Sequence, residues 1–468
     1  MTDKLTELYN ACHPLVPASP AQYVDCSRVR GDHALTTEFQ SQLDRAQAPH
    51  YLRFLFSGHI GCGKSSELRH LAETLENPAP ARPHKRHLAI LLDASEYLDD
   101  YDVTPTDILL AIVAEVAAAL REKGIGDLKD NYFVKRFNEV KEFFLTEVEI
   151  CEGELALGGA KAKIQRLQKD PEARKKVREK LQPQMTALLS EINTVFAEAR
   201  LLMGQWKPPK GQDAFSDMVL ILDNLEKIKR IAGHEEGAAS QKELFIERAP
   251  QLTSLEVHVI YTVPLRFVRS DGPQLLAAYG TAPFVLPMIK VIHRDGAYPY
   301  ADGVACLREV LQKRAGDAPI DSLFDADALD WLFRYSAGHV RDLMGFVQQA
   351  ISYTGEPPVT LDAAKRALRR TVSLFSTSIP DSHWPKLARL ERSPQRCIPS
   401  DDRDCQVMLE QVTVLEYIDG EDADRTVTDE TFSNPVPWYA VNPIVRELRE
   451  FKAAIADLDR DRPKASAP

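Results

Sequence analysis

A glycine-rich segment near the start of the chain has the residue types and the spacing of a phosphate-binding loop. It reads Gly58-His59-Ile60-Gly61-Cys62-Gly63-Lys64-Ser65, followed by Ser66, and it is a complete G-x-x-x-x-G-K-[ST] motif. Glycines let successive backbone N–H groups point at phosphate oxygens, and a helix that begins near Lys64 adds its positive N-terminal end. The Lys64 ammonium can reach the β- and γ-phosphates, and the Ser65 hydroxyl can ligate Mg²⁺. The motif predicts that residues 58–66 bind ATP or GTP with Mg²⁺, the alternative being an ordinary glycine turn.

An acidic residue ends an apolar stretch further along the chain. Val219 to Leu222 reads as a buried strand, and Asp223 follows it directly. Ligands of open parallel sheets bind beyond the carboxyl ends of the strands, so Asp223 is a candidate Mg²⁺ ligand, the alternative being a capping aspartate. Glu226 is a candidate to orient the attacking water. Its alternative role is that of a first-turn glutamate that interacts with a helix dipole.

These residues need a sheet with helices on both faces to position them. Apolar runs alternate with helical periods along the first part of the chain, which predicts a parallel α/β sheet of the P-loop NTPase type. The expected strands are residues 51–56, 87–93, 218–222, 256–262 and 284–292, and the expected helices include 36–46, 64–76, 106–123 and 241–249.

The remaining segments predict additional parts around this core. Residues 124–208 are highly charged and mostly helical by period, with an expected hairpin near 147–157, and they form either a solvated helical arm or a partner surface. Residues 302–374 are helical throughout. The expected organisation is an N-terminal segment 1–48, a P-loop NTPase core 49–295 with the insertion 124–208, an all-α lid 296–380, a winged-helix-like domain 381–455 and a tail 456–468.

Composition limits the classes of function. The 468 residues carry a formal net charge of −11 with a pI near 5.6, which argues against a protein that coats nucleic acid. No apolar run approaches a membrane span, and the N-terminus lacks the layout of a signal peptide, so a cytoplasmic location is expected. The seven cysteines are scattered without a C-x-x-C, so neither a disulfide framework nor a zinc site is expected. Cys62 is interpreted as a filler of the loop rather than as a redox switch.

The motifs resemble those of AAA+ ATPases, above all their origin-recognition-like branch, and also those of the STAND class of signal-transduction NTPases. The loop and the strand that ends at Asp223 match the Walker A and Walker B motifs. The resemblance implies that Thr262, in Ile260-Tyr261-Thr262, is the sensor 1 residue, and that Arg341, in Gly338-His339-Val340-Arg341, is the sensor 2 arginine; its alternative is a surface ion pair. Tyr23 to His33 is similar to the adenine-contacting segment. Residues 412–417 and 438–443 resemble the wing strands of a winged helix.

The sequence departs from the family pattern at two places. The position after the Walker B aspartate is Asn224 where active AAA+ enzymes carry glutamate, so slow hydrolysis is expected. The lid lacks the proline that is usual in STAND proteins, which favours the origin-recognition-like branch. AAA+ assemblies contact the γ-phosphate with an arginine of the next subunit, and Arg248 is the candidate here, with Arg266 and Arg269 as rivals. Its alternative role is that of a cap at the C-terminal end of its own helix.

Two principal functions remain open on these residues. The first is a nucleotide-controlled switch that binds ATP and Mg²⁺, acts on a protein partner or effector and belongs to signalling or anti-phage defence, either as a monomer or as a homo-oligomer. The second is a DNA-acting ATPase of the replication-initiation or transposition type. Charge favours the first, because residues 387–450 carry seven Arg, no Lys and fourteen Asp plus Glu, a net −7. A metabolic kinase is a third, weaker alternative, because the lid and the winged helix have no obvious use in one.

Overall fold

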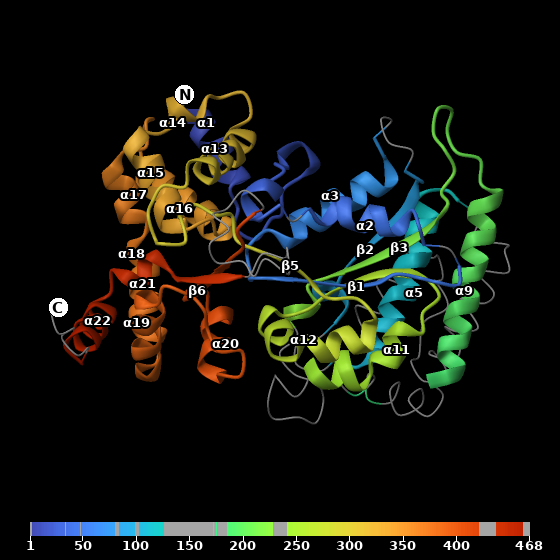
Figure 1. Cartoon of the computed structure of the whole chain (residues 1–468). Coiled ribbons are helices and arrows are strands. Elements are labelled where there is room, and N and C mark those ends of the chain that lie inside the picture. The colour runs from blue at the N-terminus through green and yellow to red at the C-terminus, as the bar shows by residue number, and fades with distance from the viewer. Residues whose placement is uncertain are drawn as a thin grey trace. The chain divides into compact units, whose positions relative to one another are not determined.

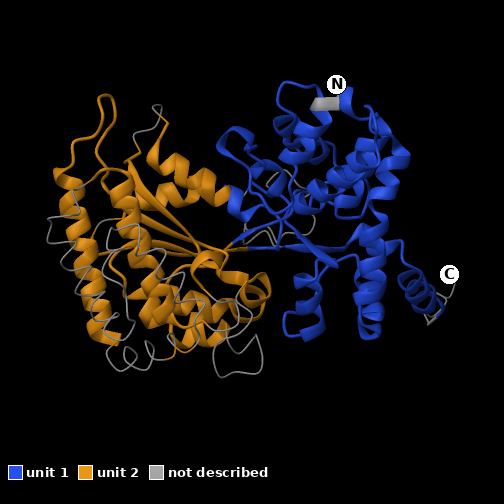
Figure 2. Cartoon of the chain, turned by 180° about the vertical axis from the view of Figure 1, so that it is seen from behind, with its two compact units in different colours: residues 1–34, 58–66, 285–468 blue, residues 35–57, 67–284 orange. Residues whose placement is uncertain are grey.

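A computed structural model gives the fold. It describes residues 2–32, 34–46, 48–79, 84–98, 103–125, 185–227, 241–420 and 437–461, together with the isolated residues Glu172 and Lys175. The chain divides into two compact units (Figures 1 and 2). Unit 1 comprises Met1–Ala34, Gly58–Ser66 and Val285–Pro468, and unit 2 comprises Leu35–Ser57 and Glu67–Phe284. The hairpin expected near residues 147–157 and most of the charged insertion lie outside the described residues.

A five-stranded sheet is the centre of the α/β part, as the sequence predicts. Its strands lie in the order β2-β3-β4-β1-β5. The registers of β2 with β3, β3 with β4, and β4 with β1 are all parallel. The bounds are Arg53–Gly58 for β1, His87–Asp93 for β2, Asp217–Asp223 for β3, His258–Thr262 for β4 and Phe284–Leu286 for β5. Each of β3 and β4 is a nearly continuous buried run, because helices cover both faces of the sheet.

Helices pack on the two faces of this sheet (Figure 1). Helix α2 (Leu35–Leu43) packs on β1, where the rings of Phe39 and Phe54 meet edge to face at 5.4 Å. On the other face, α5 (Pro105–Glu122) contacts β2 and α9 (Met185–Gln205) contacts β3. Helix α5 begins at Thr104, whose hydroxyl and N–H bind the Asp107 carboxylate in a capping box followed by Pro105. Further helices of this part are α3 (Lys64–Glu76), α4 (Ala94–Tyr97), η4 (Leu225–Lys227) and α12 (Leu265–Tyr279).

The helix expected at residues 241–249 has a different form. It is a short π-helix, η5 (Glu243–Glu247), followed by α11 (Ala249–Thr253), and the Arg248 N–H donates to the Glu243 carbonyl five residues back, at 2.8 Å. Pro250 lies in the first turn of α11, and its ring would clash with the carbonyl of Ile246 in a continuous α-helix. The strand expected at 284–292 ends at Leu286, because Pro287 follows and has no N–H for a sheet bond.

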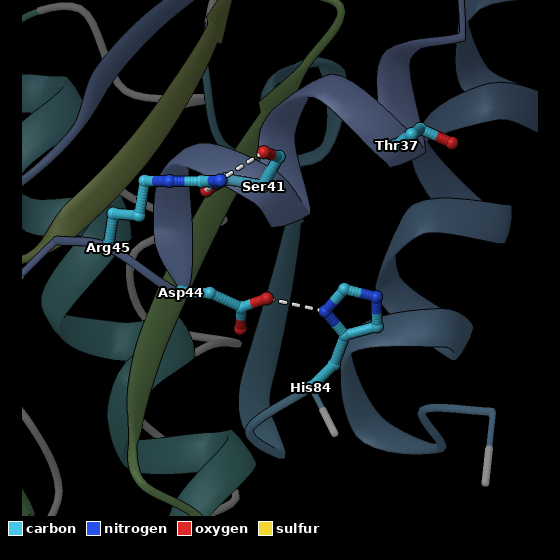
Figure 3. Close-up of a pocket in the computed structure, with 5 residues that line it drawn as sticks. All are labelled: Thr37, Ser41, Asp44, Arg45 and His84. Atoms are coloured by element: carbon cyan, nitrogen blue, oxygen red, sulfur yellow. Dashed lines mark hydrogen bonds and ion pairs between the residues drawn. The ribbon is translucent and has the colours of Figure 1, made fainter. Parts of the chain in front are cut away.

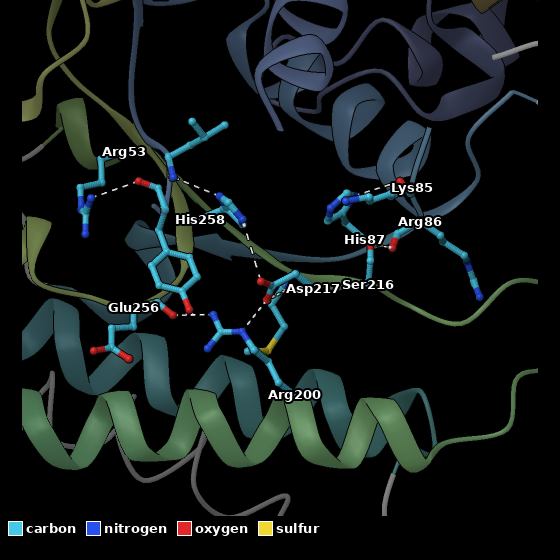
Figure 4. Close-up of polar contacts among 12 residues, drawn as sticks. Arg53, Lys85, Arg86, His87, Arg200, Ser216, Asp217, Glu256 and His258 are labelled. Atoms are coloured by element: carbon cyan, nitrogen blue, oxygen red, sulfur yellow. Dashed lines mark hydrogen bonds and ion pairs between the residues drawn. The ribbon is translucent and has the colours of Figure 1, made fainter. Parts of the chain in front are cut away.

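A polar network closes the amino edge of the sheet in unit 2 (Figure 4). The Asp217 carboxylate at the start of β3 accepts a hydrogen bond from Arg200 Nε at 2.8 Å. His258 Nδ1 at the start of β4 accepts from the Leu52 N–H at 3.0 Å, and its Nε2 lies 3.9 Å from an Asp217 oxygen. Burial lowers the pKa of His258 to about 4, against the opposing effect of Asp217. A neutral imidazole is therefore part of this edge at neutral pH.

Unit 1 is mainly helical, as the sequence predicts for the lid. Its N-terminal part contains α1 (Thr2–Ala11), η1 (Pro20–Gln22) and η2 (Ser27–Arg30). The lid helices are α13 (Ala301–Ala315), α14 (Ile320–Leu323), α15 (Ala326–Ser336), α16 (Val340–Ser352), α17 (Leu361–Ala367) and α18 (Arg369–Ser378). No helix among the described residues is long and apolar enough to cross a membrane.

The C-terminal module has the helices and the wing expected of a winged helix. Its elements are η6 (Asp381–His383), α19 (Trp384–Arg392), α20 (Arg403–Glu410), β6 (Val414–Tyr417), β7 (Trp438–Val441), α21 (Pro443–Arg446) and α22 (Arg449–Asp461). Strands β6 and β7 pair antiparallel, and Tyr417 stacks on Trp438 at 4.7 Å. A buried apolar cluster that includes Leu387, Met408 and Val445 joins the helices to the wing, so the module has a core of its own.

Candidate nucleotide-binding site

The predicted phosphate loop adopts a cradle-like backbone after β1. Gly61 has φ +87° and Gly63 has φ +110°, both in the left-handed region that favours glycine. The Lys64 side chain is buried, with 4% of its surface exposed, and its Nζ donates to the carbonyls of Gly58 and His59, each at 3.0 Å. The ammonium thus lies over its own loop, where it can exchange these carbonyls for phosphate oxygens. Ser65 is half-buried in the first turn of α3.

The start of the lid helix α16 lies directly on the loop, within unit 1. His339 Nε2 donates to the Ile60 carbonyl at 2.7 Å, and the Arg341 N–H donates to the Gly61 carbonyl at 3.1 Å. A Cβ on Gly61 would lie 2.7 Å from His339 Nε2, so only glycine fits beneath this imidazole. The other ring nitrogen of His339 accepts from the Asp342 N–H and caps α16. The lid segment that the sequence identified as sensor 2 is therefore in contact with the loop.

A second side chain connects the loop to the C-terminal module. His59 Nε2 accepts from the Glu416 N–H in β6 at 2.9 Å, and its Nδ1 donates to the Leu409 carbonyl at the end of α20 at 3.1 Å. Accepting at one nitrogen and donating at the other fixes a neutral imidazole with its proton on Nδ1. His59 is 1% exposed. One residue inside the phosphate loop thus holds two main-chain groups of the wing module.

The N-terminal segment supplies a third set of contacts to the loop. Arg30, which is 3% exposed at the end of η2, donates to the Cys62 carbonyl at 2.7 Å and also to the Pro287 carbonyl. The Ala18 N–H donates to the Ser66 hydroxyl at 3.0 Å. Arg30, near the end of the segment that the resemblance compares with an adenine-contacting element, therefore contacts the loop.

The loop surroundings fit an anionic ligand. The Arg341 side chain is half-buried, and its Nε is buried without a hydrogen-bond partner among the described residues. A buried guanidinium nitrogen without a partner costs free energy that a phosphate oxygen would recover. Positive φ at two glycines, the Lys64 ammonium and the N-terminus of α3 all have the chemistry of a phosphate site.

The carboxyl edge of the sheet in unit 2 carries the other predicted residues. Asp223 is 6% exposed at the end of β3 and pairs in register with Asp93 at the end of β2. Asn224 has φ +66°, and its side-chain amide donates to Asp93 at 2.8 Å. The Thr262 hydroxyl is fully buried and accepts from the Leu225 N–H at 2.9 Å, so it holds the turn that follows Asp223. The assignment of Thr262 as sensor 1 remains a prediction.

Glu226 and Arg248 have local environments that leave their predicted roles open. Glu226 is half-buried in the turn η4 after Asp223. Arg248 has a side chain 35% exposed and donates to the Glu243 carboxylate at 3.3 Å. Within one chain Arg248 therefore forms an ion pair with a residue of the short helix that precedes it. Nothing in a single chain tests a contact with a neighbouring subunit, and both roles remain predictions.

The predicted Mg²⁺ site requires little from the protein itself. Among the described residues, no group of three or more His, Cys, Asp and Glu side chains is arranged to hold a metal ion. Mg²⁺ at nucleotide sites is bound through one or two carboxylates together with phosphates and waters, so Ser65 and Asp223 remain the predicted protein ligands. A separate pocket of about 460 Å³ in unit 2 contains none of the predicted site residues (Figure 3). Its lining consists of Thr37, Ser41, Asp44, Arg45 and His84.

Sequence reasoning missed four features of the site. The loop motif includes His59, but nothing in the sequence indicates that its side chain contacts the wing module. His339 lies in the segment that resembles sensor 2, but the resemblance points to Arg341 rather than to the histidine. Arg30 had no signal beyond its place before the core. Asp93, by contrast, ends an apolar strand just as Asp223 does, so the same rule could have found it.

Comparison with known proteins yields similarity to solved structures alone. No known family model matches the chain, and no curated protein matches it. The ORC2 protein of Aeropyrum pernix, solved in ADPNP–ADP complexes, has a TM-score of 0.40 at 11% identity and covers 93% of this chain and 96% of its own. A Walker-type ATPase of Pyrococcus abyssi has 0.39 at 15%, covering 91% and 98%. Drosophila ORC bound to DNA has 0.39 at 11%, covering 97% and 91%. At these values no residue role is taken from the neighbours. These are distant similarities of fold to solved structures, two of them structures of ORC proteins.

Proposed function

We propose that the protein is an ATP-binding, slowly hydrolysing switch ATPase in which the nucleotide state of residues 58–65 controls the lid and the C-terminal module. The output is the binding of a protein partner or effector by that module. ATP with Mg²⁺ is the expected ligand, held by Lys64, Ser65 and Asp223, with Arg341 contributing from the lid.

The observation that carries this proposal is the pair of hydrogen bonds made by His59. For Lys64 Nζ to reach phosphate, it must leave the carbonyls of Gly58 and His59, so the loop backbone at His59 changes its environment. That backbone bears the imidazole that holds Leu409 and Glu416. Leaving a buried main-chain group unpaired costs about 1–3 kcal/mol, and 1.4 kcal/mol shifts an equilibrium tenfold. Two such groups are enough to couple the loop to the module.

Slow hydrolysis is supported by the position of Asn224. Its side chain donates to Asp93 and its backbone N–H donates to Asp223, both at 2.8 Å, so this residue is committed to the two strand ends. An amide cannot accept a proton from water as a carboxylate can. Any general base must come from another residue, of which Glu226 is the candidate.

Hydrogen exchange followed by mass spectrometry tests the switch. We expect ATP–Mg²⁺ to change amide exchange in peptides that cover residues 339–343 and 409–417 as well as in the loop. Lys64→Ala is the control that should respond nowhere. His59→Ala should raise exchange of residues 409–417 even without nucleotide, because Glu416 loses its acceptor. A nucleotide response confined to the loop in the wild-type chain would refute the coupling.

A DNA-acting ATPase is the second candidate, and one feature of this chain favours it. The helices α19 and α20 with the wing β6–β7 have the arrangement in which a winged helix presents a helix to a major groove. The net charge of −7 over residues 387–450 opposes phosphate contacts. Fluorescence anisotropy of a labelled 30-base-pair duplex, measured with ATP at two salt concentrations, separates the candidates. Salt-dependent binding would favour the DNA role, and its absence would favour a protein partner.

A further inference from the structure

Two cysteines from distant parts of the sequence meet in unit 1. Cys26 precedes η2 and Cys306 lies in the lid helix α13, 280 residues apart, yet their Sγ atoms are 2.8 Å apart and share a hydrogen bond. A disulfide has an S–S distance of about 2.04 Å, so the two sulfurs would need to approach by less than about 1 Å. A salt bridge of 3.3 Å between Arg28 and Asp302 joins the same two elements beside the thiols.

The two thiols differ in the properties that decide which one reacts first. Cys26 is 4% exposed, whereas Cys306 is half-buried and is therefore the more accessible of the two. The hydrogen bond to Cys26 lowers the pKa of Cys306, and the nearby Arg30 guanidinium lowers it further against the opposing effect of burial. Thiolate, not thiol, is the nucleophile toward oxidants. Cys306 is therefore suited to attack, and Cys26 is placed to resolve the product.

We propose that Cys26 and Cys306 form a reversible disulfide when the chain meets a peroxide oxidant. The Cys306 thiolate attacks one oxygen of hydrogen peroxide, the O–O bond breaks, and with one proton a sulfenic acid and water result. The Cys26 thiol then attacks the sulfenic sulfur, the S–S bond forms, and a second water leaves with the thiol proton. The two sulfurs lose two electrons in total, and peroxide is reduced to two waters.

The disulfide between Cys26 and Cys306 would restrain a segment that contacts the phosphate loop. Arg30 follows Cys26 by four residues and donates to the Cys62 carbonyl, and the Val29 carbonyl accepts from the Lys290 N–H at 2.9 Å. Gly303 in α13 packs so closely on the Lys290 carbonyl that a Cβ there would lie 1.7 Å from that oxygen. The disulfide would thus join a part of the lid that is already tightly packed to the segment that carries Arg30. The inference itself stands on the thiol pair and does not depend on the proposed function.

Peptide mapping of the full-length chain tests the disulfide directly. The chain is treated with one to five equivalents of hydrogen peroxide, alkylated with N-ethylmaleimide and digested without reductant. Trypsin should yield a linked species of Leu5–Arg28 with Asp295–Arg308. Chymotrypsin cleavage after Tyr23 then assigns the link to Cys26 rather than to Cys12, whose pKa burial raises to about 12. We expect at least tenfold more linked peptide than in untreated protein, and its loss on adding dithiothreitol.

Matched variants make the outcome decisive. Cys306→Ser should abolish the linked species, whereas Cys397→Ser, which changes an exposed cysteine elsewhere, should leave it unchanged. Circular dichroism spectra that overlay with wild type establish that both variants fold. Oxidation of Cys306 to the sulfinic acid while Cys26 stays alkylated would overturn the proposal. So would links that involve other cysteines in equal yield.

Discussion

Replacing His258 with asparagine should make the unfolding free energy of unit 2 fall less as the pH is lowered. The imidazole Nδ1 accepts from the Leu52 N–H, and the asparagine oxygen occupies a similar position, so His258→Asn keeps the acceptor and removes the titration. The charged and titratable groups that act electrostatically on the imidazole are Asp217, His87, Arg200 and Arg53, and all of them remain in the variant.

The pKa of His258 sets the size and the sign of the effect. Burial lowers it from 6.5 to about 4, so between these pH values the unfolded chain binds the proton and the folded chain does not. The contribution of the neutral buried imidazole to the unfolding free energy is fully present above about pH 6.5 and is lost as the pH falls toward 4. A shift of about 2.5 pH units at 1.36 kcal/mol per unit corresponds to about 3 kcal/mol. The carboxylates and His87 titrate in both the wild type and the variant. Their contributions to the pH dependence of the unfolding free energy therefore cancel when the two proteins are compared.

Urea denaturation of wild type and variant between pH 4.5 and 7.5 measures this difference. Two units need not unfold together, so unfolding is followed by pulsed hydrogen exchange of peptides that cover residues 256–262, with every pulse at one pH. The unfolding free energy of the wild type should fall more than that of the variant, by about 2.5 kcal/mol at pH 4.5. His50→Asn, at an exposed position, should behave as wild type. Equal pH slopes for wild type and His258→Asn would refute a neutral buried imidazole.

Four further predictions concern the candidate site. Lys64→Ala should abolish tight ATP–Mg²⁺ binding in calorimetric titration while the circular dichroism spectrum is retained, and unchanged affinity would contradict the loop assignment. Because Asn224 replaces glutamate, steady-state phosphate release should be well below the roughly 1–100 s⁻¹ typical of kinases, and a fast rate without a partner would show that another base suffices. Arg248→Ala should leave monomer affinity intact, lower turnover in an assembly and regain partial activity when mixed with Lys64→Ala; failure to complement would leave it as a cap. Gly338→Ala should cost at least about 3 kcal/mol or prevent folding, because φ is +77° and its Cβ would lie 1.8 Å from the Ile289 carbonyl, and a thermal melt like that of wild type would contradict this.

The sheet could be predicted because its strands are apolar runs with clear ends. The run at 218–222 differs from β3 by one residue at each end, and the helix expected at 64–76 coincides with α3. These signals are local, since burial on both faces produces continuous apolar strands and glycines mark the loop. The π-helix at 243–247 could not be read from periodicity, because the effect of Pro250 appears three residues or more before the proline itself.

The site was only partly accessible from the sequence. The loop residues follow from one motif, and Asp223 follows from its place after a strand, although their roles remain predictions. The residues that contact the loop, by contrast, could not be predicted from a motif or from a strand end. His339, Arg30 and the two main-chain groups held by His59 reach it from distant segments, and nothing in the sequence indicates that these particular groups contact the loop. Such contacts depend on tertiary packing, which no periodic pattern records.

Because these partners lie far apart in the sequence, the loop gains its contacts late in the synthesis of the chain. Residues 58–66 are made early, but the main-chain groups that His59 holds are more than 340 residues further along the chain. At roughly 5–20 residues per second, about 350 residues take on the order of 20–70 s to translate. During that interval the nascent loop has its glycines and its lysine without the complete wing module. We therefore expect ribosome-bound chains that stop before α20 to give no nucleotide-dependent protection of the loop from proteolysis, with protection first seen once β6 has left the ribosome.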